Sequence, residues 1–193
     1  MAKLKTRDLI LDVALVLFNA QGERTVTSVD LAHEMNISPG NLYYHFKGKE
    51  EVVEELYARF HACLATIIEQ MDVSATSGVG AIVAYLELIE EQIYEFRFII
   101  RDAASLCACY PAIKEPLEKL LAQLHQKIAA CVAKLPLPSY LADIENAPQL
   151  LADNLLTTVM FSRTPGSLLK AGDERDSIGK HLSLQLRPLL GGA

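Results

Sequence analysis

The stretch that most constrains the fold runs from Ser38 to Phe46 and reads Ser-Pro-Gly-Asn-Leu-Tyr-Tyr-His-Phe. Ser38 is a residue type that caps helices, and Pro39 suits the first helical position, so a short helix is predicted to begin here. On a helix of about 3.6 residues per turn, Leu42 and Phe46 share one face, while the phenols, the imidazole and the bare glycine point elsewhere. This helix is therefore expected to anchor itself by one narrow apolar edge and to present polar groups to a partner.

A second short helix is predicted directly before this one. Thr27-Ser-Val-Asp30 has the pattern of a capping box, in which a Thr side chain and an acid three residues later satisfy backbone N–H groups at a helix start. Asn36-Ile37 leaves only a tight connection between the two helices. Two short helices joined by a turn of about three or four residues form a helix-turn-helix, whose second helix enters the major groove of DNA.

Three segments occur in a fixed order around these helices. They are Thr27-Ser-Val-Asp-Leu-Ala, Ile37-Ser-Pro-Gly-Asn-Leu-Tyr-Tyr-His-Phe and Lys49-Glu-Glu. In residue type and spacing, the stretch from about residue 3 to residue 60 resembles the DNA-binding domain of the tetracycline-repressor (TetR) family of bacterial transcriptional regulators. Beyond residue 60 only length and helical character are similar. The resemblance implies a homodimeric regulator, expected to be a repressor, that binds a near-palindromic operator in double-stranded DNA.

The resemblance also implies which residues contact DNA: Thr27, Ser38, Pro39, Gly40, Asn41, Tyr43, Tyr44, His45 and Lys49. Thr27, Tyr43 and His45 are expected to bind phosphates, and Tyr44 is expected to lie deepest. The charge of Lys49 is expected to neutralise a phosphate. Pro39 stands where many relatives have a polar or basic residue, which weakens base-specific hydrogen bonding. The alternative is that the two tyrosines and the histidine only pack on the protein or face water.

Long segments with helical apolar periodicity fill the chain of 193 residues, 51% of which are hydrophobic. They predict an all-α protein of about nine helices. Residues 1–48 are expected to form the helix-turn-helix domain, and residues 49–193 a larger domain for effector binding and dimerisation. Apart from the helix-turn-helix, helices are predicted over residues 6–20, 49–71, 79–93, 94–109, 111–135, 148–161 and 173–189.

The last two helices are so apolar that they are expected to form the homodimer interface, since symmetric dimers are the commonest oligomers. The alternative is that these helices close a monomeric core. No stretch approaches ~18 uninterrupted apolar residues. The apolar residues near the N-terminus follow a helical face and are interrupted by Asp8 and Asp12, which argues against a secretory signal. A cytoplasmic location without a membrane partner is expected.

The formal net charge of −6 is unusual for a protein that neutralises DNA phosphates. Residues 1–49 hold six basic and five acidic residues, a balance of +1, so the remainder carries −7. Arg7, near the start of the first helix, could reach a phosphate that flanks the operator. Binding must therefore depend on local placement and hydrogen bonds, and modest non-specific affinity is expected.

No pattern for catalysis occurs: there is no Gly-rich phosphate loop, no meaningful Ser/His/Asp spacing and no Cys-x-x-Cys, so neither an enzyme nor a cofactor is expected. The four cysteines Cys63, Cys107, Cys109 and Cys131 lie in apolar helical segments and are expected to be reduced, buried thiols. A redox switch or a metal site is the alternative. Cys107 and Cys109 are two residues apart and point to different sides of a helix, which argues against shared ligation.

The resemblance implies a small hydrophobic effector inside the C-terminal domain. Candidate effector-binding residues are His61, Tyr85, Tyr94, Arg97, Phe98, Arg101, Asp102 and His125. Arg97, Arg101 and Asp102 form either an ion-pair cluster or a group that recognises a carboxylate with a hydrophobic tail, such as a fatty acid. Two other functions remain open: the same fold regulated by a protein partner or by redox chemistry at Cys107 or Cys109, and a helical enzyme or interaction module with a vestigial DNA-binding unit.

Overall fold

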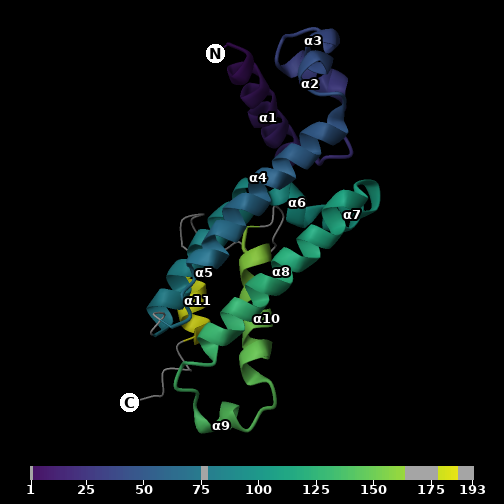
Figure 1. The fold of residues 1–193 in the computed structure, drawn as a ribbon. Coiled ribbons are helices and arrows are strands. Elements are labelled where there is room, and N and C mark those ends of the chain that lie inside the picture. Colours follow the sequence, from purple (N-terminus) through teal and green to yellow (C-terminus); the bar gives the residue numbers. More distant parts are fainter. Residues whose placement is uncertain (1, 75–77, 164–177, 187–193) are drawn as a thin grey trace. The chain divides into compact units, whose positions relative to one another are not determined.

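A computed structural model describes residues 2–74, 78–163 and 178–186. Within these ranges the chain forms eleven helices and no strand, which confirms the all-α class (Figure 1). The helices are α1 (Ala2–Gln21), α2 (Ser28–Glu34), α3 (Pro39–His45), α4 (Lys49–Gln70), α5 (Val79–Glu95), α6 (Arg97–Arg101), α7 (Ala103–Cys109), α8 (Pro111–Val132), α9 (Ser139–Ala142), α10 (Ala147–Phe161) and α11 (Ile178–Leu186).

The chain divides into two compact units. Unit 1 comprises residues 1–62 and 96–117, and unit 2 comprises residues 63–95 and 118–193. The long helices α4 and α8 contribute residues to both. Because α6 and α7 belong to unit 1, the units do not coincide with the predicted boundary after residue 48, and that functional division stays a prediction.

Unit 1 has a core built mainly on α1. Ile10, Leu11, Ala14 and Phe18 are fully buried on one side of this helix, as its apolar periodicity predicts. The helix-turn-helix contributes Leu31 and Leu42 to the same unit's core, and α4 and α6 contribute further aromatic residues. The rings of Phe18 and Phe98 lie 5.3 Å apart, and those of Phe60 and Phe96 lie 5.8 Å apart.

The C-terminal end of α1 is held by α6. The last carbonyl groups of a helix have no partner within the helix, and basic side chains can supply one. Arg101 donates hydrogen bonds of 2.9 Å to the carbonyl oxygens of both Phe18 and Asn19. Its guanidinium also forms an ion pair of 2.8 Å with Asp102. Gly22 follows with φ +89°, the left-handed conformation expected at a helix end.

Unit 2 packs α5 against α10 and α11. Its core is aliphatic and includes Ile82, Leu86, Ile89, Leu155, Leu156, Val159, Leu182 and Leu186. Glu90 is the buried acid of this core: its Oε1 accepts from Arg163 Nε at 2.6 Å and from Ser162 Oγ at 3.0 Å, whereas its Oε2 is buried without a partner. Burial raises the pKa of Glu90, and the hydrogen bonds and the charge of Arg163 offset the shift only in part.

Several predicted helix limits differ from the structure. The helix predicted over 94–109 is broken, because the Phe98 N–H bonds the Asn19 side chain at 3.1 Å and a new segment begins at Arg97, while Asp102 separates α6 from α7. α8 continues through Pro116, which removes one backbone donor from its second turn. A short helix, α9, forms in the loop predicted after α8. Of the helix predicted over 173–189, only Ile178–Leu186 lies within the described residues.

The prediction of buried cysteines is wrong for all but Cys131. Cys63 and Cys109 are exposed, and Cys107 is partly exposed. Cys63 lies outside the buried stripe that Phe60 and Leu64 form on α4, so an apolar neighbourhood in the sequence does not bury it. Within the described residues, no cluster of three metal-ligating side chains occurs, and no helix combines the length and apolar character needed to cross a bilayer.

Replacing Arg101 by Ala is expected to lower the free energy of unfolding by about 1.5–3 kcal/mol, because two carbonyl groups at the end of α1 lose a charged donor. Urea denaturation followed by circular dichroism measures the change. The exposed Lys114→Ala, in the part of α8 that belongs to unit 1, is the control and should have little effect. Equal stability of Arg101→Ala and the wild type would show that the clamp does not stabilise the fold.

Glu90 should make stability depend on pH. A carboxyl whose pKa is higher in the folded chain than in the unfolded chain stabilises the fold below its unfolded pKa, and this contribution is lost as pH rises through the folded pKa. Glu90→Gln should therefore gain stability relative to the wild type as pH rises from about 4.5, the ordinary value. Urea unfolding over a pH series measures this, with the partly exposed Glu87→Gln as control. A difference between Glu90→Gln and the wild type that does not change with pH would contradict the expectation.

Candidate nucleic-acid interface

The start of α2 is fixed by the capping box that the sequence predicts. Thr27 Oγ1 accepts from the Asp30 backbone N–H at 3.2 Å, and Asp30 Oδ2 accepts from the Thr27 backbone N–H at 2.8 Å and from the Thr27 hydroxyl at 2.7 Å. The two hydrogen bonds that Asp30 accepts from Thr27 hold the pKa of this exposed carboxyl below its usual value. The bond from the Thr27 hydroxyl has the larger effect, and the bond from its backbone N–H the smaller. The arrangement leaves Thr27 exposed at the beginning of the first helix of the motif.

The turn between the helices positions α3. Asn36 adopts φ +53°, and the backbone N–H of Ile37 bonds the carbonyl of Ala32 at 3.0 Å, which closes the turn. Ser38 Oγ then accepts from the Asn41 N–H at 3.2 Å, with Pro39 at the first helical position. The predicted cap and start of this helix are therefore confirmed.

The surface of α3 divides as its helical periodicity predicts. Leu42 and Phe46 are buried, whereas Tyr43 and Tyr44, on other sides of the helix, face outward. Tyr43 is 53% exposed and Tyr44 is 66% exposed, which is unusual for large aromatic residues. A Cβ added at Gly40 would meet only the Ser38 hydroxyl, at 3.9 Å, so no contact within the chain requires a glycine there. The bare backbone at this position remains accessible to an external partner.

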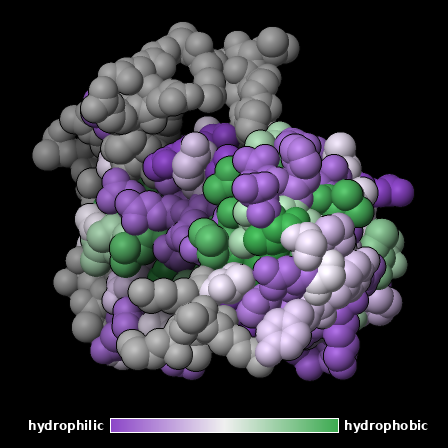
Figure 2. Space-filling view, turned by 90° about the horizontal axis from the view of Figure 1, so that it is seen from above, coloured by the Kyte–Doolittle hydropathy of each residue, from purple (hydrophilic) through white to green (hydrophobic). Residues whose placement is uncertain are grey.

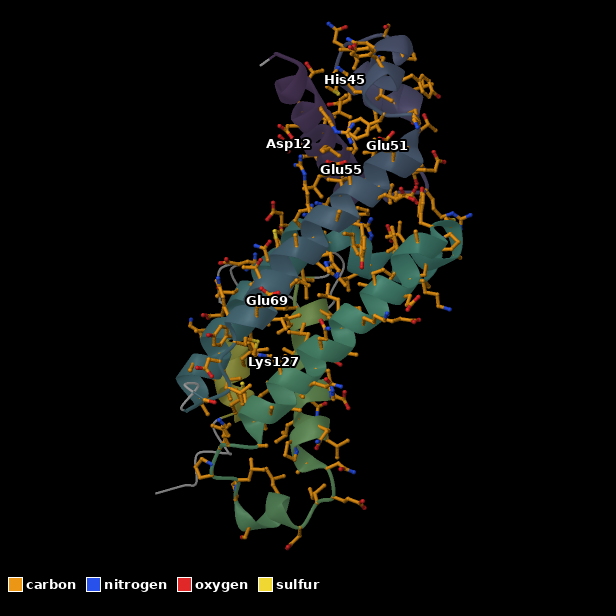
Figure 3. The ribbon with its side chains drawn as sticks, viewed as in Figure 1. Asp12, His45, Glu51, Glu55, Glu69 and Lys127 are labelled. Atoms are coloured by element: carbon orange, nitrogen blue, oxygen red, sulfur yellow. The ribbon has the colours of Figure 1, made fainter. Side chains whose placement is uncertain are left out.

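Arg7 braces α3 against α4. Its Nη1 donates to the His45 carbonyl at 2.6 Å, and its Nη2 lies 2.7 Å from Glu55 Oε2 and 3.7 Å from Glu51 Oε1. The guanidinium also stacks 4.1 Å from the centre of the Phe46 ring. His45, Glu51 and Glu55 are labelled in Figure 3. Arg7 thus donates to a carbonyl group at the C-terminal end of α3. The sequence had suggested instead that Arg7 reaches outward to a phosphate that flanks the operator.

Lys49 forms an ion pair within unit 1. Its Nζ lies 2.7 Å from the buried carboxylate of Glu23 and donates to the Glu23 carbonyl at 3.0 Å, and its side chain is 19% exposed. Tyr110 donates to the same carboxylate at 2.5 Å, and burial together with this acid raises the Tyr110 pKa. The ammonium is used within unit 1 in this structure, and phosphate neutralisation by Lys49 stays a prediction.

The effector candidates of unit 1 make separate contacts within the described residues. Arg101 and Asp102 form the ion pair that was the alternative interpretation, at the end of α1. Phe98 is fully buried against Phe18. His61, on α4, lies with its ring 6.0 Å from that of Tyr57.

The candidates of unit 2 are also scattered. The Tyr85 hydroxyl donates to the Gln70 carbonyl at 2.8 Å, and the Arg163 guanidinium lies 4.7 Å from the centre of the Tyr94 ring. His125 Nε2 lies 3.0 Å from Asp153 Oδ1. Arg97, the remaining candidate, belongs to unit 1, where it is partly exposed on α6.

A groove of about 410 Å³ occurs in unit 2 between the parts of α4 and α8 that belong to it. It is lined by Ile68, Glu69, Gln123, Gln126, Lys127 and Ala130, of which Glu69 and Lys127 are labelled in Figure 3. None of the predicted effector residues lines it. Sequence reasoning missed this groove because glutamine and alanine on a helix carry no chemical signal, and only the spacing of Gln123, Gln126 and Lys127 on one face connects them.

Comparison with known proteins supports the same assignment along most of the chain. Residues 10–56 match the family model described as bacterial regulatory proteins of the tetR family, and residues 53–184 match the model of the bacterial transcriptional repressor TetR. KstR2, an HTH-type transcriptional repressor of Mycolicibacterium smegmatis, is 36% identical over 90 residues, which cover 45% of this chain and 44% of that protein. IcaR, a negative regulator of the biofilm operon icaADBC in Staphylococcus aureus, is 29% identical over 96 residues, 50% of this chain and 48% of that protein.

The matched stretch of this chain thus spans about half the length of these curated relatives. Among solved structures, a TetR-family regulator from Marinobacter aquaeolei has a TM-score of 0.70 at 25% identity and covers 81% of this chain and 77% of its own. KstR2 of Mycobacterium tuberculosis has a TM-score of 0.69 at 20% identity, with 96% and 93% covered. These relatives are transcriptional regulators and not enzymes. Because a family model matches more than half of its residues, this chain belongs to the TetR family of bacterial transcriptional regulators.

Proposed function

We propose that this chain is a ligand-responsive transcriptional repressor that binds a near-palindromic operator as a homodimer and is released by a small hydrophobic effector. The observation that carries the proposal is the surface of α3. Leu42 and Phe46 fix this helix to the core, while Tyr43 and Tyr44 are 53% and 66% exposed, and the ring of Tyr44 lies edge-on to that of His45 at 5.2 Å. Aromatic side chains exposed on the second helix of a helix-turn-helix suit contacts in a DNA groove.

Each exposed group around α3 has a chemical use against DNA. The hydroxyls of Thr27, Tyr43 and Ser38, the amide of Asn41 and the imidazole of His45 can hydrogen-bond phosphates or base edges. Pro39 can contact the methyl group of thymine, and Gly40 allows the backbone to approach the sugar-phosphate chain. Tyr44, the most exposed of these aromatic residues, is placed to reach deepest.

Charge is proposed to contribute little to this interface, because two of the six basic residues among residues 1–49 are paired within the chain. Arg7 and Lys49 form intramolecular ion pairs, and both lie in the segment that the sequence analysis assigned to DNA binding. Affinity that does not come from releasing counterions falls less steeply with salt. Hydrogen bonds, apolar contacts and the pairing of two heads on one operator must therefore supply most of the binding energy.

The function is tested by selecting duplexes from random DNA with the purified protein at low salt and sequencing those that bind. A palindromic motif is expected with the wild type. Tyr44→Ala should weaken binding to that motif by roughly 10-fold or more, since a specific contact is worth about 1–3 kcal/mol. Fluorescence anisotropy on the selected duplex measures the change.

Leu88→Ala, at an exposed leucine of α5, is the control and should bind like the wild type. Circular dichroism should show unchanged helical content in both variants. If Tyr44→Ala binds the selected duplex as tightly as the wild type, α3 is not the helix that contacts the bases of the operator. If no motif emerges even after organic extraction of the protein to remove a bound effector, the proposal of sequence-specific DNA binding is wrong.

The dimer is proposed to form through residues 148–161 and 173–189, of which α10 and α11 are described. Leu150 and Phe161 are each more than half exposed, and their separation of eleven residues places them on one face of α10. Exposed apolar residues on a helix next to a filled core indicate an interface. A twofold contact would let this face cover itself.

Phe161→Glu should shift the protein from dimer to monomer and reduce operator binding, because each interface would then bury two carboxylates without partners. Sedimentation velocity over a range of protein concentrations measures the change. Ile144→Glu, at an exposed residue outside α10, is the control and should remain dimeric. Dimers of undiminished stability in Phe161→Glu would place the interface elsewhere.

The effector is proposed to be small and hydrophobic and to bind among the helices of the C-terminal domain. His61, Tyr85, Tyr94, Arg97 and His125 remain candidate contacts, whereas the clamp at the end of α1 already uses Arg101 and Asp102. Two proteins of similar fold support this class by their descriptions: KstR2 of Mycobacterium tuberculosis is a ketosteroid regulator and a Clostridium perfringens protein is a putative fatty acid metabolism regulator. A ligand that binds better to a conformation with altered spacing of the two heads would lower operator affinity.

A further inference from the structure

The outer side of α1 carries an apolar stripe that the core does not use. Leu9 is 53% exposed and Val16 is 66% exposed. Val13, which is partly exposed, and Ala20, which is exposed, lie on the same face. The intervals between the four residues are four, three and four, so they form one continuous row on the helix. We name this row the α1 stripe.

Neither folding nor helix propensity accounts for the α1 stripe. The opposite side of α1 already fills the core of unit 1 with Ile10, Leu11, Ala14 and Phe18, all fully buried. A β-branched residue such as Val16 at an exposed helical position is a poorer helix former than Ala, Glu or Lys and gains nothing from packing there. In Figure 1, α1 lies at the edge of the helices labelled α1 to α3. Figure 2, which views the molecule from above, shows apolar residues among hydrophilic ones on the visible face.

The spacing of the α1 stripe matches the seam of a two-helix contact. Apolar residues at alternating intervals of four and three are the a and d positions of a coiled coil. Such a row can meet an identical row about a twofold axis, because each residue then faces a counterpart of similar size and polarity. A second copy of the same helix is therefore a suitable occupant.

The charges beside the α1 stripe favour the same occupant. Asp12 is three residues from Leu9 and four from Val16, so it borders the stripe, and Figure 3 labels it beside α1. Asp12 and Asp8 pair with Arg59 of α4 at 3.8 and 2.7 Å, and all three groups are accessible to solvent. A helix edge that carries positive and negative groups side by side can form ion pairs with the same edge of a second copy across a twofold axis. Acidic groups at this margin disfavour DNA and anionic membranes.

The small area of the α1 stripe limits the strength of a contact between two copies. From Leu9 to Ala20 it is about 16 Å long and no wider than the roughly 10 Å of a single helix. Stable interfaces bury about 800 Å² on each partner, which such a strip cannot supply. The contact is therefore too weak to hold two dimers together in solution, and it needs a scaffold that raises their local concentration.

We infer that the α1 stripe is a lateral contact between two dimers of this protein bound to neighbouring operators, so that DNA binding is cooperative. The inference rests on the proposed function, because DNA is the scaffold that brings the two stripes together. Each head presents its own stripe, so a dimer bound at one operator can meet a dimer at the next only at spacings where the two α1 helices face each other.

The experiment compares duplexes carrying one or two copies of the selected operator, with the spacing between copies varied over about two turns of the DNA helix. Quantitative mobility-shift titrations give the affinity of each site. At a favourable spacing, the wild type should bind the second site roughly fivefold or more tightly than the first. The variant Leu9→Glu/Val16→Glu should bind a single operator like the wild type but should fill two operators independently.

Leu88→Glu, at an exposed leucine of α5, is the matched control and should keep the cooperativity. The variant Leu9→Ala/Val16→Ala removes the apolar contact without adding charge and should also lose cooperativity. Independent filling by the wild type at every spacing overturns the inference and leaves the proposed function standing. Cooperativity that persists in both stripe variants assigns the contact to another surface. A wild type that binds no single operator removes the proposed function, and the inference with it.

Discussion

The last carbonyl groups of α1 need hydrogen-bond donors, and the way in which they obtain them organises unit 1. Arg101 reaches both the Phe18 and Asn19 carbonyl oxygens, and the Asn19 side chain accepts the N–H of Phe98. In a continuous helix that N–H would bond a carbonyl four residues earlier, so the contact ends one helix and starts another. The break between α5 and α6 thus lies where the Asn19 side chain, in place of a helix carbonyl, accepts the Phe98 N–H. The same contacts fix α6 to the helix on which the helix-turn-helix packs.

Local features of the sequence predicted the helix-turn-helix because its determinants are close together along the chain. The Thr27–Asp30 capping box, the cap at Ser38 and the anchoring by Leu42 and Phe46 each depend on residues within one or two turns. These details are confirmed, and the family models confirm the wider assignment. The roles of the exposed residues in DNA contact stay predictions, since periodicity shows which side chains face outward but not what they bind.

The roles of the cations could not be predicted in the same way. Arg7, Lys49 and Arg101 donate hydrogen bonds to carbonyl oxygens that are 38, 26 and 83 residues away in the chain, respectively. A long basic side chain has no periodic signature, and its partner depends on which acids and carbonyl groups the tertiary fold leaves within reach. The family resemblance implies a phosphate contact for Lys49, which stays a prediction, whereas in this structure the ammonium pairs with the buried carboxylate of Glu23. Leaving a buried acid without a cation costs more free energy than an exposed phosphate contact contributes, which favours the internal pair.

The use of these cations inside the fold connects the acidic composition to assembly. The internal pairs of Arg7 and Lys49 support α3 and the start of α4, and they reduce what these two cations add to the attraction of DNA phosphates. The affinity of one head for one half-site must then be modest, and useful occupancy requires several weak contacts to act together. The proposed dimer would join two heads, and the proposed contact between neighbouring dimers would join four. α1 is apolar on two opposite sides, because one side fills the core with Ile10 and Phe18 while the other side exposes Leu9 and Val16. Such a helix can stabilise its own head with one side and contact a neighbouring dimer with the other.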